Sequence, residues 1–108
     1  MRSTSDVMLR ISNLQDAKQY YHGLLGFPIV TDTERVVGFD TGSIILYFER
    51  GEPNGSVFEF EVDHLDEVKN NLLVNGCVLV EENPSLPRCY LQDRFGLLFN
   101  LTQTYGGR

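Results

Sequence analysis

The chain has 108 residues and a mass of 12.3 kDa, which is the size of one domain that can bury a hydrophobic core. Nine Lys and Arg residues against fifteen Asp and Glu residues give a formal net charge of −6 and an isoelectric point near 4.7. This acidic balance argues against nucleic acids and anionic membrane surfaces as partners, because both are bound through positive charge. It favours a neutral or cationic ligand.

The sequence also predicts a cytoplasmic protein without a membrane segment. No apolar run approaches the roughly 20 residues that span a bilayer, and residues 1–6 show no signal-peptide core. Cys77 and Cys89 do not form a C-x-x-C pair and have no histidine nearby, which argues against a zinc site. We therefore expect both thiols to be reduced and partly buried.

The first half of the chain predicts a strand, a helix and three further strands. Residues 7–11 form the first strand, and Asn13 is placed to cap the helix. One helical face is apolar: Leu14, Ala17, Tyr20, Tyr21, Leu24 and Leu25. The helix is expected to end at Gly26. Three strands follow over residues 27–31, 35–40 and 43–50, with a tight turn at residues 40–42 between the last two.

After a loop at residues 51–55, the same order of elements begins again. Residues 57–62 alternate apolar and acidic side chains, which is typical of a strand with one buried face. Asp63 is placed to cap a helix that ends at Gly76. Strands are then predicted over residues 77–80, 88–92 and 97–102, and residues 103–108 are expected to be frayed.

The two halves can be aligned with each other, which favours an internal duplication. Residues 11–14 match residues 62–65, and Gly26 matches Gly76. A single domain, 1–108, made of two strand–helix–three-strand modules at residues 6–50 and 56–103 explains this order economically. The alternative is one α+β domain whose halves resemble each other by chance.

Strand periodicity indicates which side chains share a face, because alternate residues point to opposite sides of a sheet. Residues 57–62 and 97–102 each present one apolar face, which we assign to the core: Phe58, Phe60, Val62, Leu97, Phe99 and Leu101. The opposite faces of the strands carry Asp6, Met8, Arg10, Val57, Glu59, Glu61, Arg88, Tyr90, Leu98, Asn100 and Thr102.

Several segments together carry a family resemblance: the opening strand Val7–Ile11, the Leu24-Leu25-Gly26-Phe27 helix exit, residues 42–50, Val62-Asp63 and Asp93-Arg94-Phe95-Gly96. In order and spacing they resemble the vicinal oxygen chelate superfamily, which includes glyoxalase I, the bleomycin resistance proteins and the extradiol dioxygenases. The resemblance covers nearly the whole chain. It implies an α+β fold of two repeated βαβββ modules, forming a curved mixed sheet around a cleft, with the helices outside.

The resemblance also implies which side chains line the cleft, because it places Ile45, Tyr47 and Glu49 on the cleft side of a strand that is apolar on both faces. The predicted ligand-binding residues are Asp6, Met8, Arg10, Tyr47, Glu49, Glu59, Glu61, Arg88, Tyr90, Leu98 and Asn100. Acids beside tyrosines suit a cationic, partly aromatic guest. The alternative is that Glu59 and Glu61 form the solvated face of an antiparallel sheet.

Metal-dependent members of the superfamily hold a divalent ion with His, Glu or Gln at inward positions of the first, fourth, fifth and eighth strands. Here those positions hold Asp6, Ile45 or Tyr47, Val57 and Asn100. Hydrocarbon side chains do not bind metals, so we expect no metal, no cofactor and no catalytic residue. Asn100 is also suited to bond a neighbouring strand. A salvage set of Asp6, Glu59 and Asn100 is the alternative.

These observations predict a metal-independent small-molecule binding protein of the sequestration or resistance type, similar to the bleomycin resistance proteins and homodimeric. Its ligand is unknown and expected to be cationic or aromatic. Catalysis stays open, although the sequence argues against it. The alternatives are a metal-dependent glyoxalase-like lyase, isomerase or transferase with a non-standard ligand set, and a protein-interaction subunit with a filled cleft.

Overall fold

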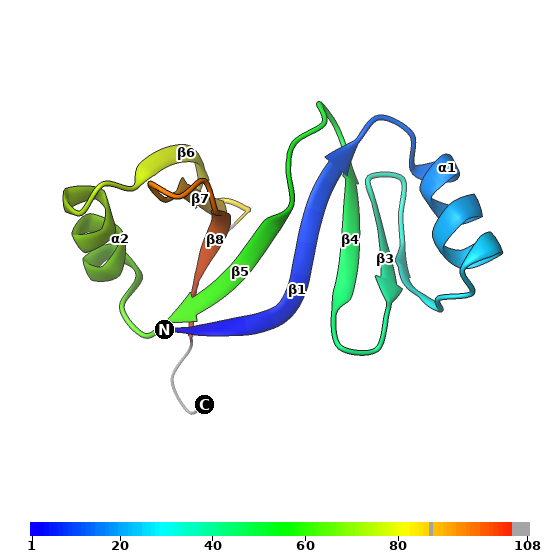
Figure 1. Ribbon diagram of the computed structural model, residues 1–108, viewed down its shortest axis with the longest axis horizontal. Helices are drawn as coiled ribbons and strands as arrows, with labels where there is room; N and C mark the ends of the chain where they lie inside the picture. Colours follow the sequence, from blue (N-terminus) through cyan, green and yellow to red (C-terminus); the bar gives the residue numbers. More distant parts are fainter. Residues whose placement is uncertain (87, 105–108) are drawn as a thin grey trace. The chain divides into compact units, whose positions relative to one another are not determined.

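The computed structural model describes residues 1–86 and 88–104 of the chain, drawn in Figure 1. These residues divide into two compact units. The first unit comprises residues 5–56, and the second comprises residues 1–4 together with the chain from residue 57 onward. None of the helices in the described residues has the length and apolar character needed to span a bilayer.

The first unit is a mixed sheet with one helical segment against it. Its elements are β1 (Arg2–Ile11, whose first residues belong to the second unit), α1 (Leu14–Ala17), η1 (Lys18–Leu24), β2 (Ile29–Asp32), β3 (Val36–Asp40) and β4 (Ile45–Arg50). The strand order is β2-β3-β4-β1, in which β1 and β4 are parallel and the other pairs are antiparallel.

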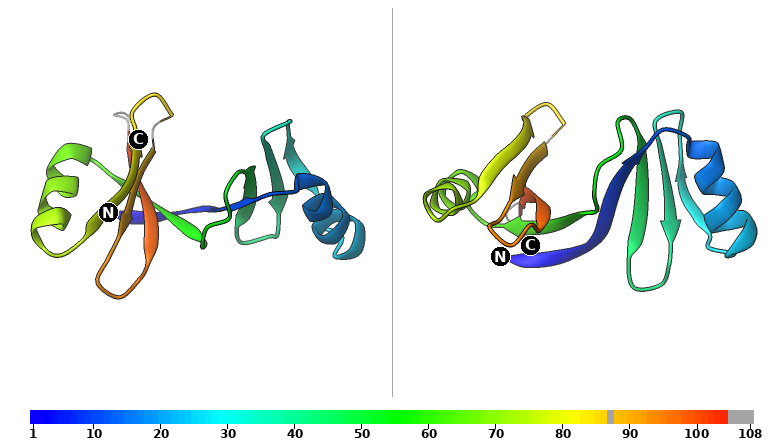
Figure 2. Two further views of the ribbon diagram at one scale, coloured as in Figure 1. Left: turned by 90° about the horizontal axis from the view of Figure 1, so that it is seen from above. Right: turned by 45° about the horizontal axis from the view of Figure 1, so that its top comes forward.

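The second unit repeats this arrangement with β5 (Val57–Val62), α2 (Leu65–Val74), β6 (Val78–Asn83), β7 (Arg88–Gln92) and β8 (Leu98–Gln103). Its strand order is β6-β7-β8-β5, with β5 and β8 parallel. Even the irregularities correspond, because β2 bulges at Val30 and β6 bulges at Val80. The predicted α+β fold of two βαβββ modules is therefore confirmed, and Figure 2 shows each helix beside the strands of its own unit.

Each unit has a hydrophobic core between its helix and its sheet. The first core consists of Leu14, Ala17, Val37, Phe39 and Phe48, and the second of Val62, Cys89, Leu91, Phe99 and Leu101. The ring of Tyr21 packs onto the first core, with its centroid 4.9 Å from that of Phe48. Since these strand residues alternate with the ones between them, the intervening side chains form the opposite face of each sheet.

The first helix differs from its sequence pattern. Asn13 caps it as predicted, accepting hydrogen bonds from the N–H groups of Gln15 and Asp16, and Gly26 ends it with a φ of 81°. Only the first turn is α-helical, however, and the following residues wind as a π-helix. The wider winding changes which residues face the core, and it leaves Leu24 72% exposed although the α-helical pattern assigned it to the buried face.

Several predicted strand ends and core positions are wrong. β1 begins at Arg2, five positions before the predicted start, so Asp6 lies inside a strand. Phe58 is 42% exposed and Leu97 is 37% exposed, although alternation assigned both to the core. The second core packs around Phe60 and Val62, further along β5, while Leu97 precedes β8.

α2 begins without the predicted cap. Asp63 lies outside the helix. The N-cap residue of α2 is His64, whose side chain makes no capping hydrogen bond. Oε1 of Gln103 instead accepts a hydrogen bond from the N–H of Leu65 at 2.8 Å, and Nε2 of Gln103 donates to the carbonyl of Asp63. Gln103 therefore ends β8 and caps α2, where a frayed tail was expected; residues 105–108 of that tail lie outside the described residues.

Candidate functional site

The sheet face opposite the helix in the first unit carries the predicted site residues of that unit. Strand register places Asp6 beside Ile45, Met8 beside Tyr47 and Arg10 beside Glu49 on the parallel pair β1–β4. Because Asp6, Met8 and Arg10 alternate along β1, they share one face with their partners on β4. All of these side chains are partly buried.

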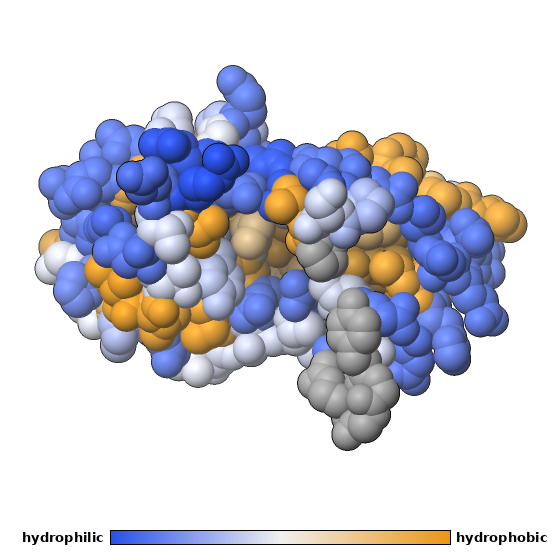
Figure 3. Space-filling model, turned by 180° about the vertical axis from the view of Figure 1, so that it is seen from behind, coloured by the Kyte–Doolittle hydropathy of each residue, from blue (hydrophilic) through white to orange (hydrophobic). Residues whose placement is uncertain are grey.

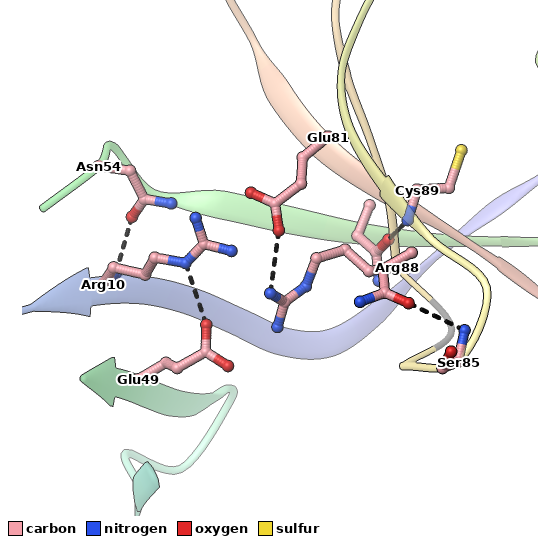
Figure 4. A network of polar contacts seen from close by, with 9 residues as sticks. Arg10, Glu49, Asn54, Glu81, Ser85, Arg88 and Cys89 are labelled. Carbon is pink, nitrogen blue, oxygen red and sulfur yellow. Dashed lines mark hydrogen bonds and ion pairs between the residues drawn. The ribbon is translucent and has the colours of Figure 1, made fainter. Parts of the chain in front are cut away.

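Arg10 is held by two neighbours, as Figure 4 shows. Its Nε donates to Oε1 of Glu49 at 3.0 Å, and both side chains are about one-fifth exposed. Its backbone N–H donates to Oδ1 of Asn54 at 2.7 Å. The loop after β4 thus helps to fix Arg10, and Arg10 in turn compensates the charge of Glu49. The sequence analysis placed Glu49 on the same face without pairing it with Arg10, and it missed Asn54.

Tyr47 lies over a glycine of the neighbouring strand. Gly38 of β3 stands opposite Tyr47 in the register, and a Cβ atom added to it would lie 2.8 Å from Cε1 of the tyrosine ring. Only a residue without a side chain leaves room for the ring at this position. The aromatic ring therefore lies against the sheet and forms an apolar surface on it.

In the second unit, Glu59, Asn100 and Tyr90 form one row across β5, β8 and β7. Oδ1 of Asn100 accepts a hydrogen bond from the backbone N–H of Cys89 at 2.8 Å. Asn100 therefore bonds the neighbouring strand, as the sequence allowed. Tyr90 is only 3% exposed, and Leu98 lies one row along, beside Gln92.

Three charged residues among the predicted site residues of the second unit have side-chain partners, and for Glu59 and Glu61 the partner lies more than 50 positions away in the sequence. Arg2 binds Glu61 with an Nε–Oε1 distance of 2.7 Å, and the hydroxyl of Thr4 donates to Oε1 of Glu59 at 2.9 Å. Arg88 binds Oε2 of Glu81 at 3.0 Å (Figure 4) and lies over the ring of Tyr90 with its Cζ atom 5.2 Å from the centroid. Arg2, Thr4 and Glu81 were missed in the sequence because no local pattern marks them.

Burial changes the acidity of three groups. Desolvation raises the pKa of the Asp6 carboxyl, and a hydrogen bond with the side chain of Ser5 partly opposes this. Burial also raises the pKa of both thiols, that of Cys89 with a further contribution from the Glu82 charge. Both cysteines are free, and a buried thiol with a raised pKa is a poor nucleophile.

The positions that bind the metal in metal-dependent members of the superfamily do not supply a ligand set here. Ile45 stands beside Asp6, Val57 is a buried hydrocarbon, and the amide oxygen of Asn100 already accepts a backbone hydrogen bond. The alternative ligand set of Asp6, Glu59 and Asn100 would need this same amide oxygen of Asn100. Among residues 1–86 and 88–104, no group of three or more His, Cys, Asp and Glu side chains could hold a metal ion. The residues present do not fit the divalent ion.

Comparison with known proteins identifies the fold. No protein-family model and no curated protein matches the sequence. A glyoxalase/bleomycin resistance protein/dioxygenase superfamily member from Vibrio splendidus 12B01 superposes with a TM-score of 0.67 at 15% identity, over 91% of this chain and 96% of that one. Homoprotocatechuate 2,3-dioxygenase from Brevibacterium fuscum gives 0.69 at 13% identity, over 94% of this chain and 36% of the dioxygenase.

The Mn(II)-bound glyoxalase from Novosphingobium aromaticivorans is also similar, with a TM-score of 0.64 at 16% identity over 94% of this chain and 38% of the glyoxalase. These similarities show that the chain has the vicinal oxygen chelate fold, as its sequence predicts. At such low identity they show the fold alone. The chain matches the Vibrio protein in extent and spans little more than a third of the other two.

Proposed function

We propose that this protein binds a small molecule without a metal ion, and that it sequesters or carries that molecule. The observation that carries the proposal is the chemistry at the family's metal positions, where Ile45 and Val57 offer no donor atom and the amide oxygen of Asn100 is already bonded. A protein that has this fold but lacks the metal ligands can still bind a small molecule, as the bleomycin resistance proteins of the superfamily do.

The proposed binding surface is, in each unit taken by itself, the sheet face opposite the helix. Small-molecule sites combine apolar and aromatic walls with a few placed polar groups, and these faces offer Met8, Tyr47, Tyr90 and Leu98 together with Asp6, Arg10, Glu49, Glu59, Glu61, Arg88 and Asn100. Asp6 in the first unit and Glu59 in the second contribute carboxylates in addition to the ion pairs Arg10–Glu49 and Arg2–Glu61, which favours a cationic ligand. The ring of Tyr47 adds a surface for cation–π contact, whereas the buried ring of Tyr90 already has Arg88 over it.

A thermal-shift experiment in EDTA-treated buffer tests the proposal. A ligand that binds only the folded state raises the unfolding temperature, so benzyltrimethylammonium is expected to stabilise the protein and benzoate is not. Glu59→Gln is expected to reduce the shift, whereas Glu67→Gln, on the exposed side of α2, is expected to leave it unchanged. Stabilisation by benzoate alone would refute the charge argument, and stoichiometric nickel, zinc or iron in the purified protein would refute metal independence.

We further propose that residues 1–108 work as one cytoplasmic binding domain with modules 6–50 and 56–103, and that two copies form a homodimer. Many large apolar side chains are exposed, which favours a protein partner. Some of this apolar surface is visible as orange patches on the face drawn in Figure 3. On the edge strand β6, Val78 is 62% exposed and Val80 is 52% exposed. An apolar edge strand is a template for pairing with another chain.

A further inference from the structure

A cavity of about 250 Å³ lies within the second unit, and Glu59, Asn100 and Tyr90 are not among the residues that line it. It is enclosed by the first turn of α2, the region where β6 ends, the start of β7 and the end of β8. Of the predicted ligand-binding residues, only Arg88 lines it. The proposed binding surface therefore does not account for this cavity.

The inner wall of the cavity is apolar. Leu101 is 1% exposed and Cys89 is 4% exposed, and Leu65 closes the wall from the helix side. The amide of Gln103, which also lines the cavity, is engaged at both ends by Leu65 and Asp63. Since the Cys89 thiol is a weak donor and is kept protonated by burial, the interior suits a hydrocarbon group rather than a polar one.

The charges at the rim select the sign of the ligand. Glu82 is bound by Lys69 with an Nζ–Oε2 distance of 2.7 Å, and Arg88 is bound by Glu81. Asp66 is exposed at the rim, and its charge interacts with the Lys69 ammonium group without a hydrogen bond or ion pair to Asp66 among the described residues. Asp66 and Glu67 already oppose the positive end of the α2 dipole, which argues against an anionic ligand.

We propose that this cavity is a second binding site, for a small organic cation whose apolar group lies against Leu101 and Cys89 and whose ammonium group pairs with Asp66. Arg88 is the one residue that this site shares with the proposed binding surface. The second site would allow the protein to bind a second molecule, or a second copy of the same molecule, in addition to one on the proposed binding surface.

Amide chemical shifts during a titration with benzylamine test this proposal at about 0.15 M salt, where distant charges are screened. We expect the amides of Leu65, Cys89 and Asp66 to shift, and benzoate, which has a similar shape and opposite charge, to shift none of them. Asp66→Asn is expected to weaken benzylamine binding about 2- to 5-fold, the range of an exposed ion pair.

Glu67→Gln is the matched control, because Glu67 is the next residue of the same helical turn, is exposed as Asp66 is, and does not line the cavity. Its benzylamine affinity is expected to equal that of the unmodified protein. Equal losses in both variants, equal binding of benzoate, or an absence of shifts at Leu65 and Cys89 would each refute the second site. Shifts confined to Glu59 and Asn100 would also refute it, while supporting the proposed binding surface.

Discussion

Gly38 is the residue on which the position of Tyr47 depends. A Cβ at this position would come within 2.9 Å of two atoms of the tyrosine ring and 3.2 Å of Cβ of Thr31. We expect Gly38→Ala to lower the free energy of unfolding by about 1–3 kcal/mol, the usual cost of overpacking, in urea titrations. Gly55→Ala is the control, because an added Cβ there meets nothing within 4 Å. Equal stability of both variants would show that the ring moves aside without cost.

The raised pKa of Asp6 makes a second prediction at a single residue. Because burial raises the pKa of this carboxyl above its usual value of 3.8, the folded protein holds the proton more tightly than the unfolded chain does. Ionisation of Asp6 therefore costs nothing below pH 3.8, and it reduces stability as the pH rises through the folded-state pKa.

We expect Asp6→Asn to resist urea better than the unmodified protein at about pH 7 and equally well at about pH 3, because only the carboxylate is penalised by burial. Glu34→Gln, at an exposed loop position, is expected to change stability at neither pH. Lower stability of Asp6→Asn at pH 7 would mean that the carboxylate makes a favourable contact that outweighs its desolvation.

At the level of elements, α2 depends on a side chain from the other end of its unit. Gln103 satisfies the N–H of Leu65 and the carbonyl of Asp63, and His64 at the N-cap provides no side-chain cap. We expect Gln103→Ala to cost about 1 kcal/mol of stability, as the loss of a helix cap does, measured by chemical denaturation. Gln19→Ala, at an exposed position of η1, should cost less. The prediction is wrong if the two variants are equally stable.

Local sequence signals predicted the elements well where the structure depends on neighbours in the chain. Alternation placed the strand at residues 57–62 with its observed ends, and glycine placed both helix ends, because Gly26 and Gly76 adopt positive φ angles. The cap of α2 was missed because Gln103 lies 38 positions from Leu65. The π-helical winding was missed for a different reason, since its apolar spacing is compatible with an α-helix.

The same distinction applies to the candidate site. Alternation predicted that Glu59, Tyr90 and Asn100 share a face, and the strand register places them in one row. It could not identify their hydrogen-bond partners, because pairing depends on strand register. Arg2 and Glu61, for instance, are 59 positions apart. More of the negative charge on this face is therefore paired with positive charge than the sequence alone indicates.

At the level of the whole molecule, the two modules have kept their topology while their side chains have diverged. The repeat makes Gly38 of β3 equivalent to Tyr90 of β7, and Tyr47 of β4 equivalent to Asn100 of β8. Each module thus places one tyrosine in the corresponding row of its sheet, on different strands. Backbone hydrogen bonding, which any sequence can make, follows the same pattern in both modules, while the side chains on the corresponding sheet faces differ.

The two edge strands are the clearest case of such divergence, and they predict how copies associate. The bulge residues Val30 of β2 and Val80 of β6 are equivalent and about equally exposed, at 49% and 52%. Only β6 adds further apolar exposure beside its bulge, at Val78 and Leu79. We therefore expect the homodimer to form through β6, where a lysine would place a charge in the interface.

Sedimentation velocity of two matched variants tests this expectation. Val80→Lys is expected to be monomeric at concentrations where the unmodified protein is dimeric, and to lose the dependence of its unfolding temperature on protein concentration. Val30→Lys introduces the same charge at the equivalent bulge and is expected to remain dimeric. A monomeric unmodified protein would refute the dimer. Dissociation by Val30→Lys alone would place the interface on β2, because a lysine charge opposes association only where the partner buries it away from water.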